Sequence, residues 1–242
     1  MASVSNMPES HNEWSARWTI AFVGVALVVA LIALGVLLAI MGYSPIALIR
    51  QALDGLLAAS SVQAMWYVTR AAGILSYLLL WLSTVWGLAV SNKILDPVLH
   101  RAFTYDFHQF LSLLAIGFII LHIGVLLADK YLPFTVAQVL VPFAAPYRPV
   151  WVGIGTIGLY LTLLVSITFY IRRLIGQKTF RAIHLVSYIA FIAAALHGLF
   201  AGTDSPLPTV QWMYLLTTLS VVFLTAYRIV TSKRLRRQGS AA

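Results

Sequence analysis

Long apolar stretches separated by short polar connections constrain the fold of this chain more than any other feature. A helix rises 1.5 Å per residue, so about 20 apolar residues are needed to cross the hydrocarbon core of a bilayer. A water-facing surface is excluded because only 10% of the 242 residues are charged, against about 25% in soluble domains. The expected spans are residues 18–42, 65–91, 104–128, 151–175, 181–202 and 209–231. The sequence therefore predicts an all-α membrane protein, a six-transmembrane-helix bundle.

The segments outside the spans are too short for a soluble domain. Residues 1–17 are expected to be a polar N-terminal tail, 18–231 the helix bundle, and 232–242 a basic tail. Within the bundle, the apolar residues of segment 44–57 recur at helical spacing, but the segment is too short to span, so we expect an interfacial helix there. The chain has no cysteine, which excludes disulfides, thiolate metal sites and covalent haem attachment.

The basic residues predict the orientation. Six spans put both termini on one side of the membrane, and twelve of the sixteen Lys and Arg residues fall on that side. Cytoplasmic segments carry the excess of Lys and Arg, so both termini are expected to be cytoplasmic. The net charge of +9 is then explained by topology and by anionic lipid, and it predicts no nucleic-acid partner.

Four histidines lie inside two of the predicted spans, where an ionisable side chain is costly and usually functional. These spans cross in the same direction, and each carries one histidine near its cytoplasmic end and another about 20 Å farther out. They are His108 and His122 in the third span, and His184 and His197 in the fifth. Facing imidazoles at two depths are suited to two haems, each with two axial histidines, between helices 3 and 5.

Other roles for these histidines stay open. A membrane histidine also forms hydrogen bonds between helices, as in a cofactor-free scaffold subunit. A histidine-based proton or metal-ion transport path is a further alternative, although Asp106 is the only acid within or at the edge of these two spans.

The spacing in the fifth span conflicts with an ideal helix. Thirteen residues turn such a helix through about 1300°, which leaves the two histidines about 140° apart around the axis. We therefore expect altered winding in the fifth span, or ligands that reach the cofactors from different flanks.

These histidine spacings, fourteen in the third span and thirteen in the fifth, resemble the ferric reductase-like transmembrane domain. That family includes NADPH oxidases, ferric reductases, the STEAP proteins and the haem subunit of the periplasmic methionine sulfoxide reductase system. The segment "TFRAIHLVSYIAFIAAALHG" (179–198) looks like the fifth span of NADPH oxidases. The resemblance implies two non-covalent haem b groups whose iron atoms have axial histidine ligands. His108 and His184 would hold the inner haem, and His122 and His197 the outer one.

The resemblance also assigns a role to Arg70 in "WYVTRAAG", at the outer end of the second span. It implies that the guanidinium binds a propionate of the outer haem. The alternative is that Arg70 snorkels to the outer surface. Gly73, Gly117 and Gly124 are expected to let a porphyrin approach the helix backbones closely.

The chain departs from the larger family members because it carries no flavin or nicotinamide site. We expect transmembrane electron transfer through two stacked haems, in an oxidoreductase subunit that needs a separate reductase partner. The donor would be a cytoplasmic flavoprotein or a quinol. The acceptor at the outer face would be a ferric chelate, dioxygen or a partner protein. A flavin-free chain of this size favours the plasma (inner) membrane of a bacterium, with the lipid bilayer as its surroundings.

Overall fold

The computed structural model describes residues 64–129 and 133–239, and every regular element within them is a helix. Five helical segments of this part are long and apolar enough to cross a membrane. The chain is therefore an all-α, multi-pass membrane protein, as predicted. The expected first span, residues 18–42, and the interfacial helix 44–57 lie outside the described residues, so the count of six stays a prediction. The candidate spans are Met65–Ser91, Arg101–Ala128, Pro149–Tyr170, Gln177–Ala201 and Pro208–Thr231.

The described helices follow one another along the chain with short connections. The first pair is α3 (Ala64–Ser91) and α4 (Arg101–Ala128), and the short α5 (Val136–Leu140) follows it. The remaining helices are α6 (Pro149–Tyr170), α7 (Arg172–Ile175), α8 (Gln177–His184), α9 (Ser187–Ala201) and α10 (Pro208–Gly239). The predicted span 151–175 is thus interrupted at Ile171, between α6 and α7.

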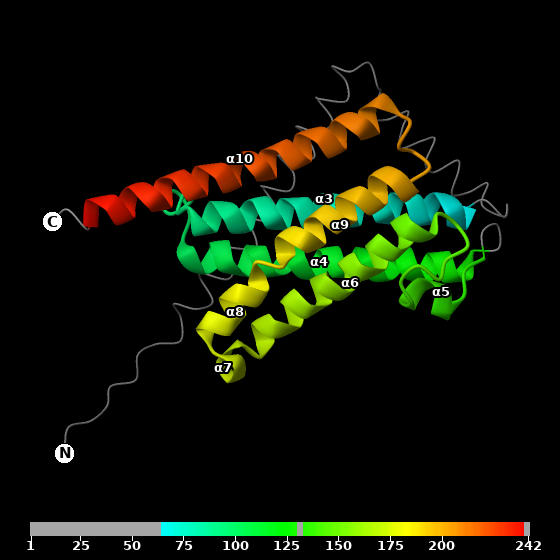
Figure 1. The fold of residues 1–242 in the computed structure, drawn as a ribbon, viewed down its shortest axis with the longest axis horizontal. Coiled ribbons are helices and arrows are strands. Elements are labelled where there is room, and N and C mark those ends of the chain that lie inside the picture. Colours follow the sequence, from blue (N-terminus) through cyan, green and yellow to red (C-terminus); the bar gives the residue numbers. More distant parts are fainter. Residues whose placement is uncertain (1–63, 130–132, 240–242) are drawn as a thin grey trace, which may run out of the picture. The chain divides into compact units, whose positions relative to one another are not determined.

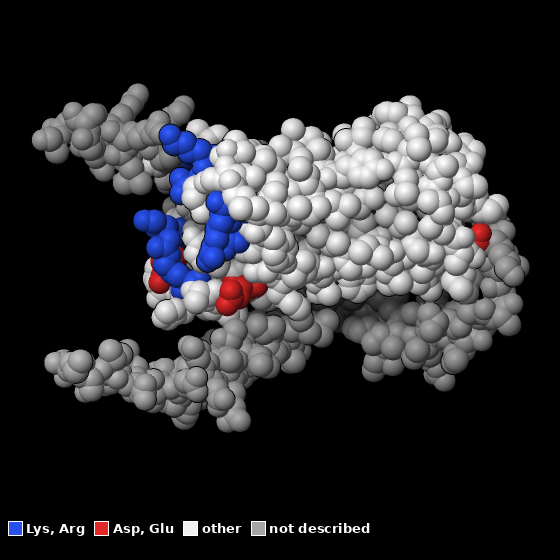
Figure 2. Space-filling view, turned by 90° about the horizontal axis from the view of Figure 1, so that it is seen from below, with Lys and Arg blue, Asp and Glu red and all other residues white. Residues whose placement is uncertain are grey.

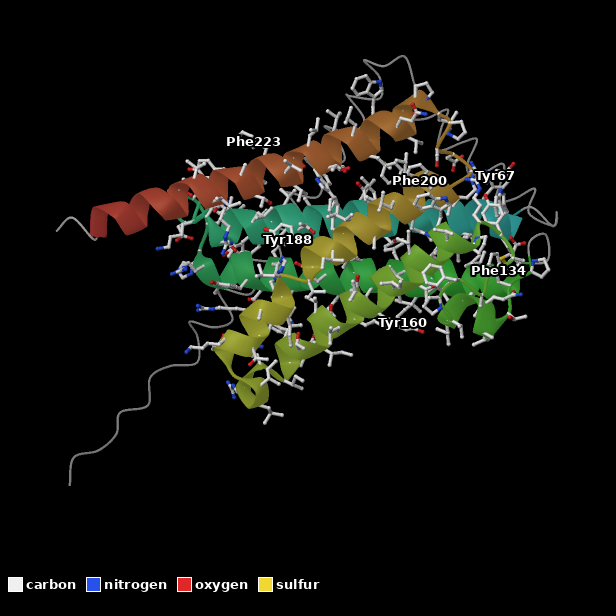
Figure 3. The ribbon with its side chains drawn as sticks, viewed as in Figure 1. Tyr67, Phe134, Tyr160, Tyr188, Phe200 and Phe223 are labelled. Carbon is white, nitrogen blue, oxygen red and sulfur yellow. The ribbon has the colours of Figure 1, made fainter. Side chains whose placement is uncertain are left out.

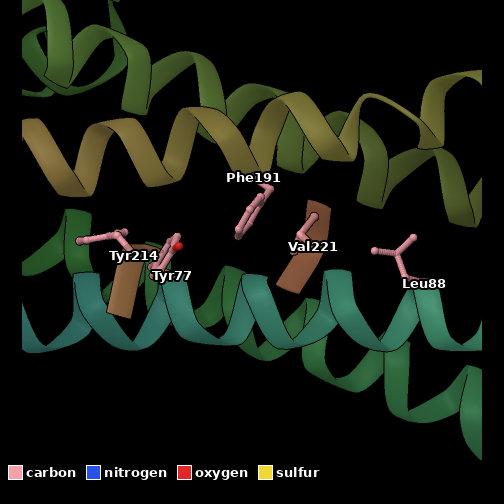
Figure 4. Packing of buried hydrophobic residues seen from close by; sticks show 5 residues of the cluster. All are labelled: Tyr77, Leu88, Phe191, Tyr214 and Val221. Atoms are coloured by element: carbon pink, nitrogen blue, oxygen red, sulfur yellow. The ribbon is translucent and has the colours of Figure 1, made fainter. Parts of the chain in front are cut away.

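The helices pack as two hairpins and a covering helix. α3 packs mainly on α4, α6 packs mainly on α9, and α3 also contacts α9 and α10. Figure 1 shows that α4 and α9 run in the same direction, as expected for the third and fifth spans. The apolar core joins α3, α9 and α10. Its buried members are Tyr77, Leu88, Phe191, Tyr214 and Val221 (Figure 4).

Phe191 is the largest fully buried side chain among the described residues. It is 2% exposed, and its ring stacks on Tyr77 with 5.8 Å between the ring centroids. The Tyr77 hydroxyl bonds the hydroxyl of Thr217 on α10 at 2.5 Å. A buried hydroxyl needs such a partner, so this bond fixes α10 against α3.

The fifth span is not one continuous α-helix. Leu185 and Val186, between α8 and α9, have ψ angles of −22° and −18°, close to 3₁₀ values. The amide of Val186 donates to the carbonyl of Ile183, and that of Tyr188 to Leu185, both three residues back. A 3₁₀ turn advances about 120° per residue instead of about 100°. Two such residues supply about 40° of the missing 140°, so part of the expected altered winding is present.

The charges divide the described part into two ends. Lys and Arg side chains gather at the end where α7 and α8 lie (Figure 2). At the other end lie aromatic side chains, among them Tyr67, Phe134 and Phe200 (Figure 3). Cytoplasmic ends of membrane proteins are typically basic, and the orientation of this chain stays a prediction. We call the pair of histidines nearer the basic end the inner pair, and the other the outer pair.

Candidate functional site

The four membrane histidines form two pairs, each joining α4 to the fifth span. The ring centroids of His108 and His184 lie 6.0 Å apart, and those of His122 and His197 lie 6.3 Å apart. The ring planes are inclined by 72° and 80°, so neither pair is stacked face to face. The structure therefore brings together both pairs that the sequence predicted, although α4 packs mainly on α3 and α9 mainly on α6.

The separations within the pairs suit one metal atom between two imidazoles. A metal–imidazole bond is about 2 Å long, which puts the centres of two opposed rings about 6.3 Å apart. Among the described residues, no group of three or more His, Cys, Asp or Glu side chains is arranged to hold a metal ion. A bare ion would therefore have two protein ligands, whereas a zinc site usually has three or four. A porphyrin supplies the equatorial nitrogens itself, so this donor set fits haem better than a free cation.

The outer pair has a defined tautomer. The Nδ1–H of His122 donates to the carbonyl of Thr69 at 2.8 Å, and the Nδ1–H of His197 donates to the carbonyl of Trp151 at 2.9 Å. A carbonyl only accepts hydrogen bonds, so the proton of each neutral ring is on Nδ1. The lone pair of Nε2 is then free to bind a metal, and the hydrogen bond orients the ring for that role.

A chain of hydroxyls defines the tautomer of His108 in the same way. The Ser112 hydroxyl lies 2.9 Å from the carbonyl of His108, to which it must donate. Its single proton is then used, so Ser83 donates in the 2.8 Å bond between the two serines. The remaining contact of Ser83, 3.3 Å to Nδ1 of His108, must be accepted from the ring. His108 therefore also carries its proton on Nδ1 and leaves Nε2 free.

The same three histidines each pack against a glycine of the neighbouring helix. A Cβ added at the glycine would come within 2.5 to 3.1 Å of the ring, whereas ordinary van der Waals contact begins at 3.4 Å. At Gly155 a residue with no side chain is required for the ring to lie where it does, whereas at Gly73 and Gly87 a Cβ would push the ring by a few tenths of an ångström. The contacts are Gly73 with His122, Gly87 with His108, and Gly155 with His197. In contrast, Gly117 and Gly124 have no neighbour within 4 Å of an added Cβ.

An oxygen acceptor and a glycine together form what we call an imidazole cradle. In every case the acceptor residue precedes the glycine by four positions, one helical turn. The three cradles are Thr69 with Gly73, Ser83 with Gly87, and Trp151 with Gly155. The first two are fourteen residues apart in α3, which matches the fourteen-residue histidine spacing in antiparallel α4. This repeat was not predicted, although its signal is visible in the sequence.

His184 has no cradle of this kind. Its Nδ1 atom is buried and has no hydrogen-bond partner among the described residues. None of the described glycines has His184 among the nearest neighbours of its added Cβ. The ring of Phe180 lies beside it, with 5.4 Å between the centroids. His184 is therefore brought to His108 without the hydrogen bond that orients the other three rings.

A cavity of about 220 Å³ surrounds the outer pair, lined by residues of α3, α4, α6, α9 and α10. Arg70 and Asp204 lie at its edge and form an ion pair. The Nε of Arg70 donates to one carboxylate oxygen at 2.7 Å, and a terminal nitrogen bonds the other oxygen. The anion that Arg70 meets in the structure is thus a carboxylate of the chain itself. Its predicted contact with a haem propionate stays a prediction.

Comparison of the chain with known protein families, characterised proteins and solved structures found no match. The function is therefore inferred from the geometry of the histidine pairs and from the chemistry of their surroundings.

Proposed function

We propose that this protein binds two haem b groups and carries single electrons across the membrane, as the ferric reductase-like transmembrane domains that it resembles do. The observation that carries the proposal is the arrangement of the four imidazoles. They form two pairs with ring separations suited to one iron each. In three of the four rings, hydrogen bonding leaves Nε2 free as a ligand.

Each part of the chain has a defined task in this proposal. His108 and His184 hold the inner group, while His122 and His197 hold the outer one. The haems supply the one-electron chemistry when bound. Apolar helix walls exclude water from the path, and the buried ring of Phe191 fills the core between α3, α9 and α10. Arg70 stands at the edge of the outer cavity, where a propionate would compete with Asp204 for the guanidinium.

The direction of transfer follows from the proposed topology. The donor on the cytoplasmic side is a flavoprotein or a quinol. The acceptor meets the outer haem and is a ferric chelate, dioxygen or a partner protein. The setting is the plasma membrane of a bacterium, with both termini in the cytoplasm.

Metal-ion transport is less well supported than electron transfer. A transport site needs ligands that replace most of the hydration shell of the ion. The described residues offer two histidines at each depth and no third His, Cys, Asp or Glu side chain beside them. The Nδ1 atoms of three rings are also engaged by fixed acceptors.

Reconstituted vesicles test the proposed electron transfer. Purified protein loaded with haem is placed in liposomes that contain ferricyanide, and dithionite is added outside. We expect loss of the ferricyanide absorbance only in vesicles that contain the protein. The double variant His122→Ala/His197→Ala removes the outer site and should stop the reaction. Loss of absorbance no faster than in protein-free vesicles, with two haems bound per chain, would refute the proposal.

A further inference from the structure

We infer that His184 is the exchangeable iron ligand of the inner site. A small neutral ligand displaces it there, while both histidines of the outer pair remain bound to their iron. The inference rests on the proposed function because it concerns the same four histidines. It follows from the contrast between three cradled imidazoles and one that lacks a cradle.

The hydrogen bonding of the rings sets His184 apart from the other three histidines. His108, His122 and His197 each donate Nδ1–H to an oxygen of a neighbouring helix. Such a partner raises the basicity of the ligand and fixes its orientation, and losing it typically weakens metal affinity about 10- to 100-fold. The buried Nδ1 of His184 has no such partner among the described residues. Of the four bonds from histidine to iron, the one from His184 is therefore the weakest.

The helix that carries His184 is also loosely held. This residue is the last of α8, directly before the 3₁₀ break at Leu185 and Val186. None of the eight residues of α8, all within the described part, is buried. The main contacts of α8 are with α6 and α7. A short segment with few contacts to the rest of the bundle is displaced at low free-energy cost, so we expect His184 to withdraw without disturbing the bundle.

His197, at the other end of the fifth span, is held much more firmly. α9 contains buried residues along its length, including Phe191. Its last carbonyls are bound by the loop before α6, because Arg148 donates to the carbonyl of Phe200 at 2.6 Å and Tyr147 donates to that of Ala201 at 3.1 Å. The partner of His184 is also fixed, since α4 is a continuous helix. The structure therefore singles out one ligand of the four for exchange.

Carbon monoxide is the probe for this inference, because it is neutral and binds ferrous haem that has an open axial position. The full chain is purified in detergent, reduced with dithionite and titrated with the gas while the Soret band is recorded. We expect about half of the haem to bind carbon monoxide, namely the inner haem. Binding to none of the haem, or to all of it, would overturn the inference.

Site variants identify which haem responds. His122→Ala/His197→Ala should leave one haem that binds carbon monoxide completely. His108→Ala/His184→Ala should leave one haem that does not bind it, and the opposite assignment would overturn the inference. If these variants do not accumulate, Ser83→Ala is a smaller change at the inner site, because it removes only the hydroxyl that accepts from His108 and donates to Ser112. It should shift the Soret band of the carbon monoxide complex and leave the spectrum of the unreactive haem unchanged, whereas a shift confined to the unreactive haem would contradict the inference.

The two proposals fail in different ways. A protein that binds no haem contradicts the proposed function itself. A protein with two haems per chain, of which neither binds carbon monoxide, leaves the proposed function intact and refutes the exchange of His184.

Discussion

Gly155→Ala is the substitution for which the structure gives the clearest expected effect. The added Cβ would lie 2.5 Å from Nδ1 of His197, whereas ordinary contact begins at 3.4 Å. The ring therefore has to move by about 0.9 Å. Such a shift stretches or breaks the 2.9 Å hydrogen bond from Nδ1 to the carbonyl of Trp151. The variant thus acts on the outer site through one imidazole.

The size of the effect has two contributions. Overpacking costs about 1–3 kcal/mol, and a lost hydrogen bond costs about 0.5–1.5 kcal/mol. Together they amount to about 1.5–4.5 kcal/mol, which weakens binding of the outer haem about 10- to 2,000-fold. Haem per chain, measured as the pyridine haemochrome after purification, should fall from two toward one. The haem that remains should keep its low-spin spectrum, because the inner pair is untouched.

Gly117→Ala is the matched control. Gly117 also lies in a membrane helix, but it is exposed and a Cβ there would meet no protein atom within 4 Å. This variant should retain two haems and the spectrum of the unmodified protein. A loss of haem in this variant would instead support the predicted close approach of a porphyrin to Gly117. If Gly155→Ala also retains two haems with an unchanged spectrum, the reasoning about the imidazole cradles is wrong.

Three further substitutions test other contacts of the site. Ser83→Ala removes the hydroxyl that accepts from His108 and should weaken inner-haem binding about 10- to 100-fold, as measured by haem titration of the apoprotein. Ser83→Thr keeps a hydroxyl and should recover the affinity. Arg70→Leu leaves the carboxylate of Asp204 unpaired and should destabilise the fold by about 1–3 kcal/mol. In thermal unfolding, the double variant Arg70→Leu/Asp204→Leu should then be more stable than either single variant, and additive losses would argue against a coupled pair. Tyr77→Phe removes the hydrogen bond between Tyr77 and Thr217 of α10 and should lower the free energy of unfolding by about 1 kcal/mol. The haem content should stay unchanged, and loss of a haem in this variant would contradict a purely structural role of Tyr77.

Much of the fold can be predicted from the sequence because hydropathy reports directly on burial in lipid. The predicted spans 65–91, 104–128 and 209–231 match described helices within a few residues. The pairing of the four histidines can be predicted too, because depth along a helix is set by residue count. Each prediction depends on a property that belongs to single residues and their spacing.

The break in the fifth span and the imidazole cradles depend on contacts between distant segments. Leu185 and Val186 are ordinary apolar residues, so nothing in their identity marks a 3₁₀ turn. Two of the three acceptors are backbone carbonyls, and every residue has one. The ion pair that Asp204 forms joins residues 134 positions apart. Such features emerge only when the helices are packed against one another.

The most direct test of the central claim is the absorption spectrum of the detergent-purified protein, oxidised and dithionite-reduced, with haem counted per chain. The account predicts about two b-type haems per chain and the low-spin bands of iron with two imidazole ligands. A protein expressed with ample haem that contains none would contradict it, and the two histidine pairs would then need another explanation.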